Sequence, residues 1–336
     1  MNVLLLVGGN SSEREVSFYS GKTIFEALQR LGHKVTVLDP ASDIDILDSS
    51  GQYIIPESSN SESISYTLKP EIIATTIMSH AMENVDVVFV GLHGGSGENG
   101  AVQCLLDMKG MKYTGSGMTS SAVAMDKAIT KRLAASVEIR TPLWALCRIE
   151  DGTDEKEILE QIRSHFDFPM IVKPNDSGST VGLTNVETPR QLYPALVKAS
   201  VESPNVLVEK YIKGRELTVS VLDGQALPVV EIIPESGLYD YEAKYMKGKS
   251  QYIVPAEIRR EIKNAIQEDA VKMYDIVGAS GLVRVDFILD ENEKHYFLEL
   301  NTLPGMTALS LVPMAAKAVG IQFDELITKI LDSALK

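Results

Sequence analysis

The spacing of hydrophobic residues in the first third of the chain predicts strands and helices in alternation. Continuous apolar runs at 1–9, 33–40 and 85–92 are typical of strands that are buried on both faces. Between them, residues 11–32 and 71–83 carry apolar positions at helical spacing. This order predicts an open parallel sheet, and such sheets bind ligands at the carboxyl ends of their strands.

The pattern changes at about Gly115, after which the expected elements are shorter. Residues 117–136 predict one helix with a Ser- and Thr-rich start. Short strands, with one or two helices between them, are expected at 141–150, 168–174, 181–187 and 206–212. Antiparallel strands are expected at 215–224, 226–234, 282–290 and 295–302, flanked by helices at 257–278 and 306–320. The predicted fold class is therefore α/β in the first part and α+β in the rest.

Two polar segments interrupt these patterns. Residues 43–68 are rich in Ser, Asp and Ile and predict an irregular insertion with a small hairpin. Residues 235–254 are polar and rich in Tyr and Lys. A long loop of this kind inside a compact domain is typically a lid, so we expect one here.

The overall charge excludes several classes of function. The chain of 336 residues has a formal net charge of −14 and a sequence pI of about 4.9. Such an acidic chain lacks the electrostatic footprint of a protein that binds nucleic acid or an anionic membrane. No apolar run is long enough to cross a bilayer, and the first residues predict a strand rather than a signal peptide. Cys104 and Cys147 have no CxxC partner, which favours buried thiols in a reducing cytoplasm.

A glycine-rich stretch at 91–100, GLHGGSGENG, follows one of the predicted strands. It contains a literal G-x-G-x-x-G at 95–100, the pattern of dinucleotide-binding loops. An NAD-binding protein would need an acidic residue about 20 positions further on, at the end of a second strand. The corresponding residues, 118–125, contain no acid and predict the start of a helix. We therefore expect the glycines to serve close approach to another ligand.

Two of the predicted antiparallel strands bring polar side chains together. If Leu289 faces Tyr296 in the hairpin, Phe287 faces Leu298 and Val285 faces Leu300 on an apolar face. The other face then opposes the pairs Asp286 with Glu299 and Arg284 with Asn301. Arg284 could neutralise one carboxylate while solvent takes the other. We favour a divalent cation, because carboxylate and amide oxygens are the ligands that Mg²⁺ prefers.

Basic and acidic residues near the middle of the chain suggest a nucleotide site. Lys173 ends a predicted strand before a loop of small polar residues, which could fold over phosphates or form a plain hairpin. Glu209 and Lys210 end another strand, and Glu216 follows. An extended segment of this kind can bind adenine with its backbone and ribose with a carboxylate. Taken alone, this segment is better interpreted as a solvated, charged edge strand.

In combination, these stretches resemble the D-alanine–D-alanine ligase family of the ATP-grasp superfamily. The resemblance spans nearly the whole chain in family order. The matching stretches are GGNSSEREVS, LHGGSGENG, YTGSGMTSSAVAMDK, IVKPNDSGSTVG, VLVEKYIKGRELTV, YDYEAKY, VRVDFIL and LELNTLPGMTALSLVPMAA. It implies a Rossmann-like substrate domain at 1–114, a small ATP-grasp domain at 115–209 and a carboxyl-terminal ATP-grasp domain at 210–336, with ATP between the last two.

The resemblance also implies a reaction. ATP would phosphorylate the carboxylate of one D-alanine, and the amine of a second D-alanine would attack the acyl phosphate to form the dipeptide for peptidoglycan synthesis. A closed lid would keep water from the acyl phosphate. The expected location is the cytoplasm, and a homodimer is the family expectation.

Residue roles follow from the matching motifs. For the nucleotide, the implied residues are Lys127 and Lys173 at the phosphates and Glu209, Lys210, Tyr211, Ile212, Glu216 and Tyr239 around adenosine. Two Mg²⁺ or Mn²⁺ ions would be held by Asp286, Glu299 and Asn301. For the amino acids and the chemistry, the implied residues are Glu13, His93, Ser179, Lys244, Tyr245, Arg284, Gly305, Ser310 and Leu311.

These last residues divide by task. Arg284 and the Gly305 amide would stabilise the oxyanion, and Glu13 would pair with the ammonium of the first D-alanine. Ser310 and Lys244 would bind the carboxylate of the second D-alanine, with Leu311 beside them. Ser179 and Tyr245 would link Glu13 to the lid. His93 would shape the D-alanine site, although a purely structural histidine is the alternative.

The residues at 284–301 and in the predicted lid distinguish the ligase from rival interpretations. A non-catalytic nucleotide-binding regulator would have lost the groups for metal and oxyanion, yet Arg284, Asp286, Glu299 and Asn301 are all present. Leu303 departs from the serine that is common in the family, at a position that we expect to be peripheral to the ligands. The lid pattern EAKY at 242–245 is that of dipeptide-forming members, which places D-lactate well behind D-alanine as the second substrate; a D-alanine–D-serine ligase is a further alternative.

Overall fold

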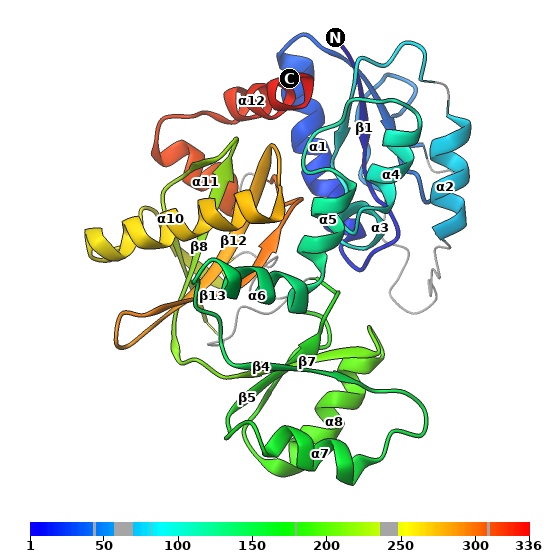
Figure 1. The fold of residues 1–336 in the computed structure, drawn as a ribbon. Coiled ribbons are helices and arrows are strands. Elements are labelled where there is room, and N and C mark those ends of the chain that lie inside the picture. Colours follow the sequence, from blue (N-terminus) through cyan, green and yellow to red (C-terminus); the bar gives the residue numbers. More distant parts are fainter. Residues whose placement is uncertain (43–44, 57–69, 81, 179, 236–247, 308–309) are drawn as a thin grey trace.

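The computed structural model describes residues 1–336 except 43–44, 57–69, 81, 179, 236–247 and 308–309 (Figure 1). Four of the expected site residues lie outside the described residues: Ser179, Tyr239, Lys244 and Tyr245. Among the described residues, none of the helices has the length and apolar character needed to cross a membrane.

The amino-terminal part is the parallel sheet that the sequence predicts. Its strand order is β2-β1-β3, with β1 (Asn2–Leu6) between β2 (Lys34–Leu38) and β3 (Val87–Val90). Alternate residues of β1 face opposite layers, as period-two geometry requires. Leu5 packs with helix α1 (Arg14–Arg30), whereas Leu4 packs with α2 (Pro70–Ser79) and α4 (Ala101–Met108). The short helix α3 (Gly95–Glu98) precedes α4.

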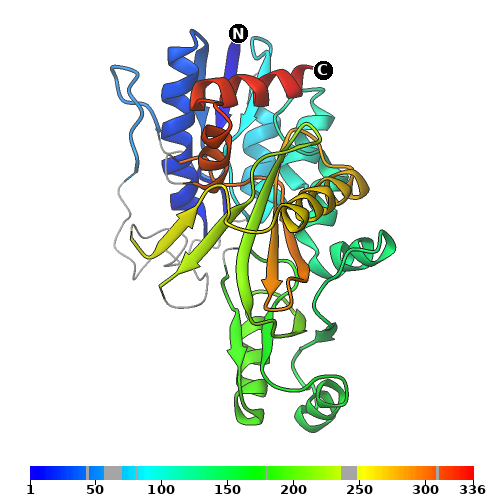
Figure 2. The ribbon, with the colours of Figure 1, turned by 90° about the vertical axis from the view of Figure 1, so that its left-hand side faces the viewer.

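A second sheet forms the lower end of the molecule in both views (Figures 1 and 2). Its four antiparallel strands, in the order β4-β7-β5-β6, are β4 (Trp144–Arg148), β7 (Asn205–Lys210), β5 (Met170–Pro174) and β6 (Thr184–Val186). Helices α7 (Glu155–Arg163) and α8 (Pro189–Ser200) bury their apolar faces against it.

The third sheet lies between the other two. Its main path is β11-β10-β8-β12-β13, and every neighbouring pair is antiparallel. The strands are β8 (Gly214–Leu222), β9 (Gln225–Ala226), β10 (Val230–Pro234), β11 (Ser250–Ile253), β12 (Leu282–Asp290) and β13 (His295–Asn301). Helix α10 (Arg260–Val277) covers one face. Helix α11 (Leu311–Ala318) and helix α12 (Phe323–Leu335) join the other face to α1.

Several local predictions were wrong or incomplete. The single strand expected at 226–234 is divided into β9 and β10. The single helix expected at 117–136 is two helices, α5 (Met118–Met125) and α6 (Lys127–Ser136), because Asp126 is extended and caps α6 by accepting a hydrogen bond from the amide of Ile129. The end of the expected loop at 235–254 is strand β11, which pairs with β10. Helix α12 was not expected at all.

The hairpin register was correct at one end and shifted by one residue at the other. Arg284 faces Asn301 and Asp286 faces Glu299, as expected. Beyond them a β-bulge makes Phe287 face Phe297 rather than Leu298, and Leu289 face His295 rather than Tyr296. The rings of Phe287 and Phe297 meet edge to face in the core, which favours this pairing. The bulge leaves Leu298 and Glu299 facing the same cavity.

Candidate functional site

Two adjoining cavities contain the expected site residues. A cavity of about 910 Å³ lies where the carboxyl edge of the first sheet meets β12 and β13. Its lining includes Glu13, His93, Lys127, Arg284, Glu299, Asn301, Gly305, Ser310 and Leu311. A cavity of about 160 Å³ lies between the second and third sheets. Its lining includes Lys127, Lys173, Glu209, Lys210, Tyr211, Ile212, Glu216, Asp286 and Glu299. Lys127 and Glu299 line both, so the cavities meet there.

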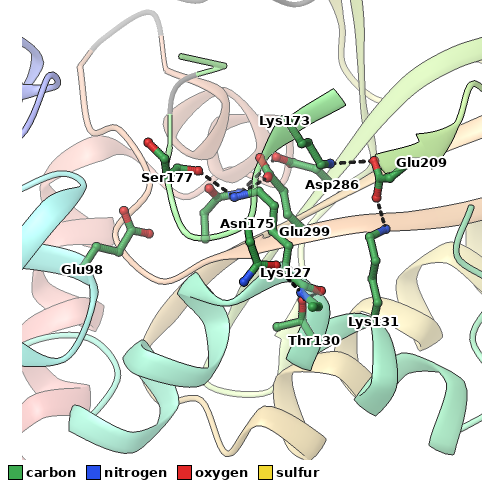
Figure 3. A network of polar contacts seen from close by, with 12 residues as sticks. Glu98, Lys127, Thr130, Lys131, Lys173, Asn175, Ser177, Glu209, Asp286 and Glu299 are labelled. Carbon is green, nitrogen blue, oxygen red and sulfur yellow. Dashed lines mark hydrogen bonds and ion pairs between the residues drawn. The ribbon is translucent and has the colours of Figure 1, made fainter. Parts of the chain in front are cut away.

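Lys127 stands at the junction of these cavities, on the first turn of α6. Its Nζ donates a hydrogen bond to the carbonyl oxygen of Ser177 at 2.7 Å and lies 3.5 Å from Oε2 of Glu299. It therefore connects the loop after β5 with the polar face of β13 (Figure 3). A buried ammonium group in this position can bind an anion that enters from either cavity.

Asn175 fixes the loop after β5 to the start of α6. Its carbonyl oxygen accepts a hydrogen bond from the amide of Lys127 at 3.1 Å, and its side-chain oxygen accepts one from the amide of Ala128 at 2.9 Å. Together with Asp126, Asn175 occupies the first amides of the helix. Protein groups thus satisfy this helix terminus, so the positive charge available here comes from lysine side chains rather than from helix amides.

A buried carboxylate lies between two lysines at the end of the smaller cavity. Lys131 Nζ is 2.5 Å from Oε1 of Glu209, and Lys173 Nζ is 2.8 Å from Oε2 (Figure 3). Burial alone would raise the pKa of Glu209, but the two lysines outweigh burial and lower that pKa to about 2. Burial also lowers the pKa of Lys131 to about 8, against the attraction of Glu209. The three groups carry one net positive charge when all are ionised.

Arg284 and Asp286 pair directly on β12. The guanidinium donates from Nε to Oδ1 at 2.9 Å and from Nη2 to Oδ2 at 2.8 Å. Asp286 also accepts hydrogen bonds from the Thr218 hydroxyl at 2.6 Å and from the Asn301 amide at 3.0 Å. The sequence allowed Arg284 to neutralise one carboxylate as an alternative to a metal ion. Arg284 does pair with Asp286 in this structure.

The donor set nevertheless fits a divalent cation. Asp286 and Glu299 are directly opposed on adjacent strands, with side chains 18% and 25% exposed, and both line the smaller cavity. Hard oxygen atoms that face a cavity suit Mg²⁺ or Mn²⁺. The Arg284 guanidinium and the Asn301 amide now donate to the Asp286 oxygen atoms, so a bound cation would compete with these donors. The described part of the chain has no group of three or more His, Cys, Asp or Glu side chains that could hold a metal ion, so the donor set here is two carboxylates and the Asn301 amide.

Glu13 lies against two glycines at the edge of the larger cavity. A Cβ atom at Gly94 would lie 2.4 Å from its Oε2, and one at Gly178 would lie 2.9 Å away. The loops after β3 and β5 therefore need glycine to approach this carboxylate closely. Glu13 is 9% exposed, so a cation that reaches it from the cavity would be largely desolvated.

His93 is buried and holds the loop that follows β13. Its Nδ1 is 2.8 Å from the carbonyl oxygen of Leu303, so this nitrogen carries the proton. Its Nε2 lies 3.0 Å from the Ser20 hydroxyl. Burial lowers the pKa of His93, which favours the neutral ring and leaves Nε2 to accept from Ser20. The histidine thus positions the loop as well as lining the larger cavity.

Glu98, which was not predicted as a site residue, binds the same loop. Its Oε1 accepts hydrogen bonds from the amides of Thr302 at 2.9 Å and Leu303 at 3.1 Å, and its Oε2 accepts one from Gly94 at 3.2 Å. Burial and the nearby charge of Glu13 raise the pKa of Glu98 to about 7. The carboxyl group therefore ties the loop after β3 to the loop after β13.

The remaining expected residues lie at the start of α11. The Ser310 hydroxyl accepts a hydrogen bond from the Thr307 amide at 3.0 Å. A Cβ atom at Gly305 would lie 3.0 Å from that hydroxyl, so the turn brings both residues to one wall of the larger cavity. Leu311 is the first residue of the helix and lines the same wall.

Sequence reasoning missed Lys131, Glu98, Asn175 and Thr218. A signal existed for Lys131, because it is four residues after Lys127 and shares its helix face. Glu98 was read only as part of a glycine pattern, and its partners are more than 200 residues away. No local pattern identifies such distant contacts.

The comparisons with known proteins agree over the full length. Residues 2–116 match the family described as the D-ala D-ala ligase N-terminus, and residues 133–332 match its C-terminus. The chain is 39% identical to a D-alanine–D-alanine ligase of Gloeobacter violaceus, with both chains covered completely. It is 39% identical to the one of Aquifex aeolicus, over 98% of this chain and 100% of that one.

Solved structures of the same kind resemble it. The VanG D-Ala:D-Ser ligase of Enterococcus faecalis has a TM-score of 0.79 and 28% identity, with 99% of each chain covered. The D-alanine–D-alanine ligase of Bacillus anthracis complexed with ATP has a TM-score of 0.77 and 29% identity, over 100% of this chain and 97% of that one. From the fold, the two cavities and these full-length matches, we conclude that the chain belongs to the D-alanine–D-alanine ligase family of ATP-grasp proteins.

Proposed function

We propose that the chain joins two molecules of D-alanine at the expense of one ATP. The γ-phosphoryl group passes to the carboxylate of the first D-alanine, which yields ADP and D-alanyl phosphate. The amine of the second D-alanine attacks the acyl carbon, and the tetrahedral intermediate collapses with loss of phosphate and a proton. The observation that carries this proposal is that two cavities meet at Lys127 and Glu299, one with Lys173 at its wall and the other with Glu13 and Arg284.

The smaller cavity suits the nucleotide. Lys127 and Lys173 provide two ammonium groups for the phosphates. Between the second and third sheets, the backbone of Lys210 and Ile212 and the side chain of Tyr211 would hold the adenine. The carboxylates of Glu209 and Glu216 would bind the amino group of the base and the ribose hydroxyls. Tyr239, which lies outside the described residues, is proposed for the same site from its motif.

The larger cavity suits the two amino acids. Glu13 would bind the ammonium group of the first D-alanine, since it presents a nearly buried carboxylate at the cavity wall. Arg284 and the Gly305 amide would stabilise the oxyanion of the tetrahedral intermediate. Ser310 would bind the carboxylate of the second D-alanine beside Leu311. His93 would hold the wall in place through the Leu303 carbonyl.

Divalent cations complete the proposed site. Asp286, Glu299 and Asn301 would hold two Mg²⁺ or Mn²⁺ ions, which when bound neutralise the charge on the ATP phosphates. Arg284 lines the larger cavity beside these ligands and would face the reacting carboxyl there.

Three further assignments rest on the family motifs. Ser179, Lys244 and Tyr245 are proposed to close the site and bind the second D-alanine, and they lie outside the described residues. The three sheets support a division into domains at 1–114, 115–209 and 210–336. A cytoplasmic location would supply the ATP for this reaction, and the expected homodimer stays a prediction for sedimentation velocity to test.

A substrate panel tests the proposal directly. We expect phosphate release from ATP and Mg²⁺ with D-alanine, and none with L-alanine. D-Serine and D-lactate belong in the panel, since one similar structure is a D-Ala:D-Ser ligase. Phosphate release should be faster with D-alanine alone than with a mixture in which D-serine or D-lactate replaces most of the D-alanine. An absence of D-alanine-dependent release would contradict the proposed function.

A further inference from the structure

Among the largest fully buried side chains in the described part of the molecule is a lysine, Lys131. Charged side chains are almost never fully buried unless they are paired, because desolvation costs several kcal/mol per ion. Lys131 is 0% exposed and has two polar partners, Glu209 and the Thr141 hydroxyl at 2.7 Å. Packing alone would be served by an apolar side chain of the same length, so the charge itself requires an explanation.

The geometry places Lys131 behind the nucleotide cavity. Lys173 and Glu209 line that cavity, whereas Lys131 reaches Oε1 of Glu209 from helix α6 (Figure 3). Glu209 Oε2 is bound to Lys173 at 2.8 Å. The carboxylate therefore has one cation on the cavity side and one on the protein side.

The balance of charge gives Lys131 a task. Without Lys131, Glu209 and Lys173 would form a neutral pair, because the negative charge of the carboxylate would offset the positive charge of the Lys173 ammonium. With Lys131 present, one net positive charge remains in the group of three. Since an ammonium in a low-dielectric site attracts phosphate strongly, this remaining charge decides how well Lys173 binds an anion.

We propose that Lys131 is a positioning residue for the nucleotide site: it neutralises Glu209 from behind, so that the positive charge of Lys173 stays available to the ATP phosphates. This inference rests on the proposed function. It adds a residue that does not touch the nucleotide and acts through the carboxylate. Its consequence is that Lys131 matters for nucleotide affinity only as long as Glu209 is ionised.

A double-mutant cycle with ADP as the probe tests this dependence. The proteins are the wild-type chain, K131M, E209Q and K131M/E209Q, each in the full-length form with Mg²⁺, and the dissociation constant is measured by calorimetry. In the presence of Glu209, K131M should weaken ADP binding on the order of tenfold. In the E209Q background, the same change should alter ADP binding by less than about twofold, because no carboxylate is left to neutralise.

Folding and specificity need their own controls. K131M leaves Glu209 paired with Lys173, so the variant should fold, and circular dichroism checks this. The matched control is K272M. Lys272 pairs with the carboxylate of Asp269, which also has His295 as a second partner. None of these three residues lines either cavity. K272M should bind ADP like the wild type. In steady-state assays, K131M should raise the KM for ATP and leave the KM for D-alanine unchanged.

The outcomes separate this inference from the proposed function. A loss of less than about fivefold in K131M, or an equal loss with and without Glu209, would overturn the role of Lys131 while ADP binding by the wild type still supports the nucleotide site. No ADP binding by the wild-type chain would instead refute the proposed function itself.

Discussion

Glu98 makes the stability of this protein depend on pH in a defined direction. Its pKa is raised to about 7 in the folded chain, first by burial and then by the charge of Glu13, from the ordinary value of 4.5. The unfolded chain therefore loses the Glu98 proton at lower pH than the folded one. Stability contributed by the neutral carboxyl group is present at low pH and is lost as the pH rises through about 7.

The size of this loss follows from the shift. Each pKa unit corresponds to about 1.4 kcal/mol, which sets an upper limit of about 3 kcal/mol for Glu98. Because the side chain faces the larger cavity, water screens part of the effect, and we expect about 1 to 2 kcal/mol between pH 5 and pH 8. In E98Q the amide oxygen retains the hydrogen bonds from Thr302 and Leu303 and only the longer one from Gly94 is lost, so the loop after β13 should stay in place.

Urea unfolding of wild type and E98Q at pH 5 and pH 8 measures this effect. The free energy of unfolding of the wild type should fall more steeply with pH than that of E98Q, by about 1 to 2 kcal/mol over the interval. The control is E71Q, which changes an exposed residue of α2 and should follow the wild-type profile. Parallel profiles for wild type and E98Q would refute the assignment of a raised pKa to Glu98.

Three further substitutions probe the proposed site. D286N should lower kcat on the order of a hundredfold, because it removes the charge of a proposed metal ligand. The circular dichroism spectrum should be unchanged. A near-normal kcat would mean that the metal assignment is wrong. N175A should lower the free energy of unfolding by about 1 kcal/mol and raise the KM for ATP, because it removes the side-chain acceptor for the amide of Ala128. N175D keeps that acceptor and should retain the stability. An equal loss of stability in N175A and N175D would count against this cap. G178A should raise the KM for D-alanine several-fold, since its Cβ would lie 2.9 Å from the Glu13 carboxylate. The control is G117A, whose Cβ meets only an ordinary contact at 3.7 Å, so its KM for D-alanine should equal that of the wild type. Equal KM values for the two variants would contradict the placement of Glu13.

Much of the fold could be predicted because its signals are local. The buried strands β1 and β3 are continuous apolar runs, and the parallel sheet follows from their alternation with helices. The hairpin register near Asp286 also follows from period two. The shift beyond it could not be predicted, because the edge-to-face contact of Phe287 and Phe297 depends on packing rather than on alternation.

The site was predictable only in part for a similar physical reason. The family motifs identify side chains that face the cavities, such as Glu13, Lys173 and Arg284. They do not identify the groups behind those side chains. Lys131 acts through Glu209, and Glu98 acts through backbone amides of a distant loop, so both depend on tertiary contacts that a single sequence does not encode locally.

The reaction product tests the central claim most directly. Purified chain, ATP, Mg²⁺ and D-alanine are incubated together, and the dipeptide is measured by mass spectrometry beside the phosphate released. The account predicts D-alanyl-D-alanine and phosphate in equal amounts, with neither formed when D-alanine is replaced by L-alanine. Phosphate release without the dipeptide, or no reaction with D-alanine, would contradict it.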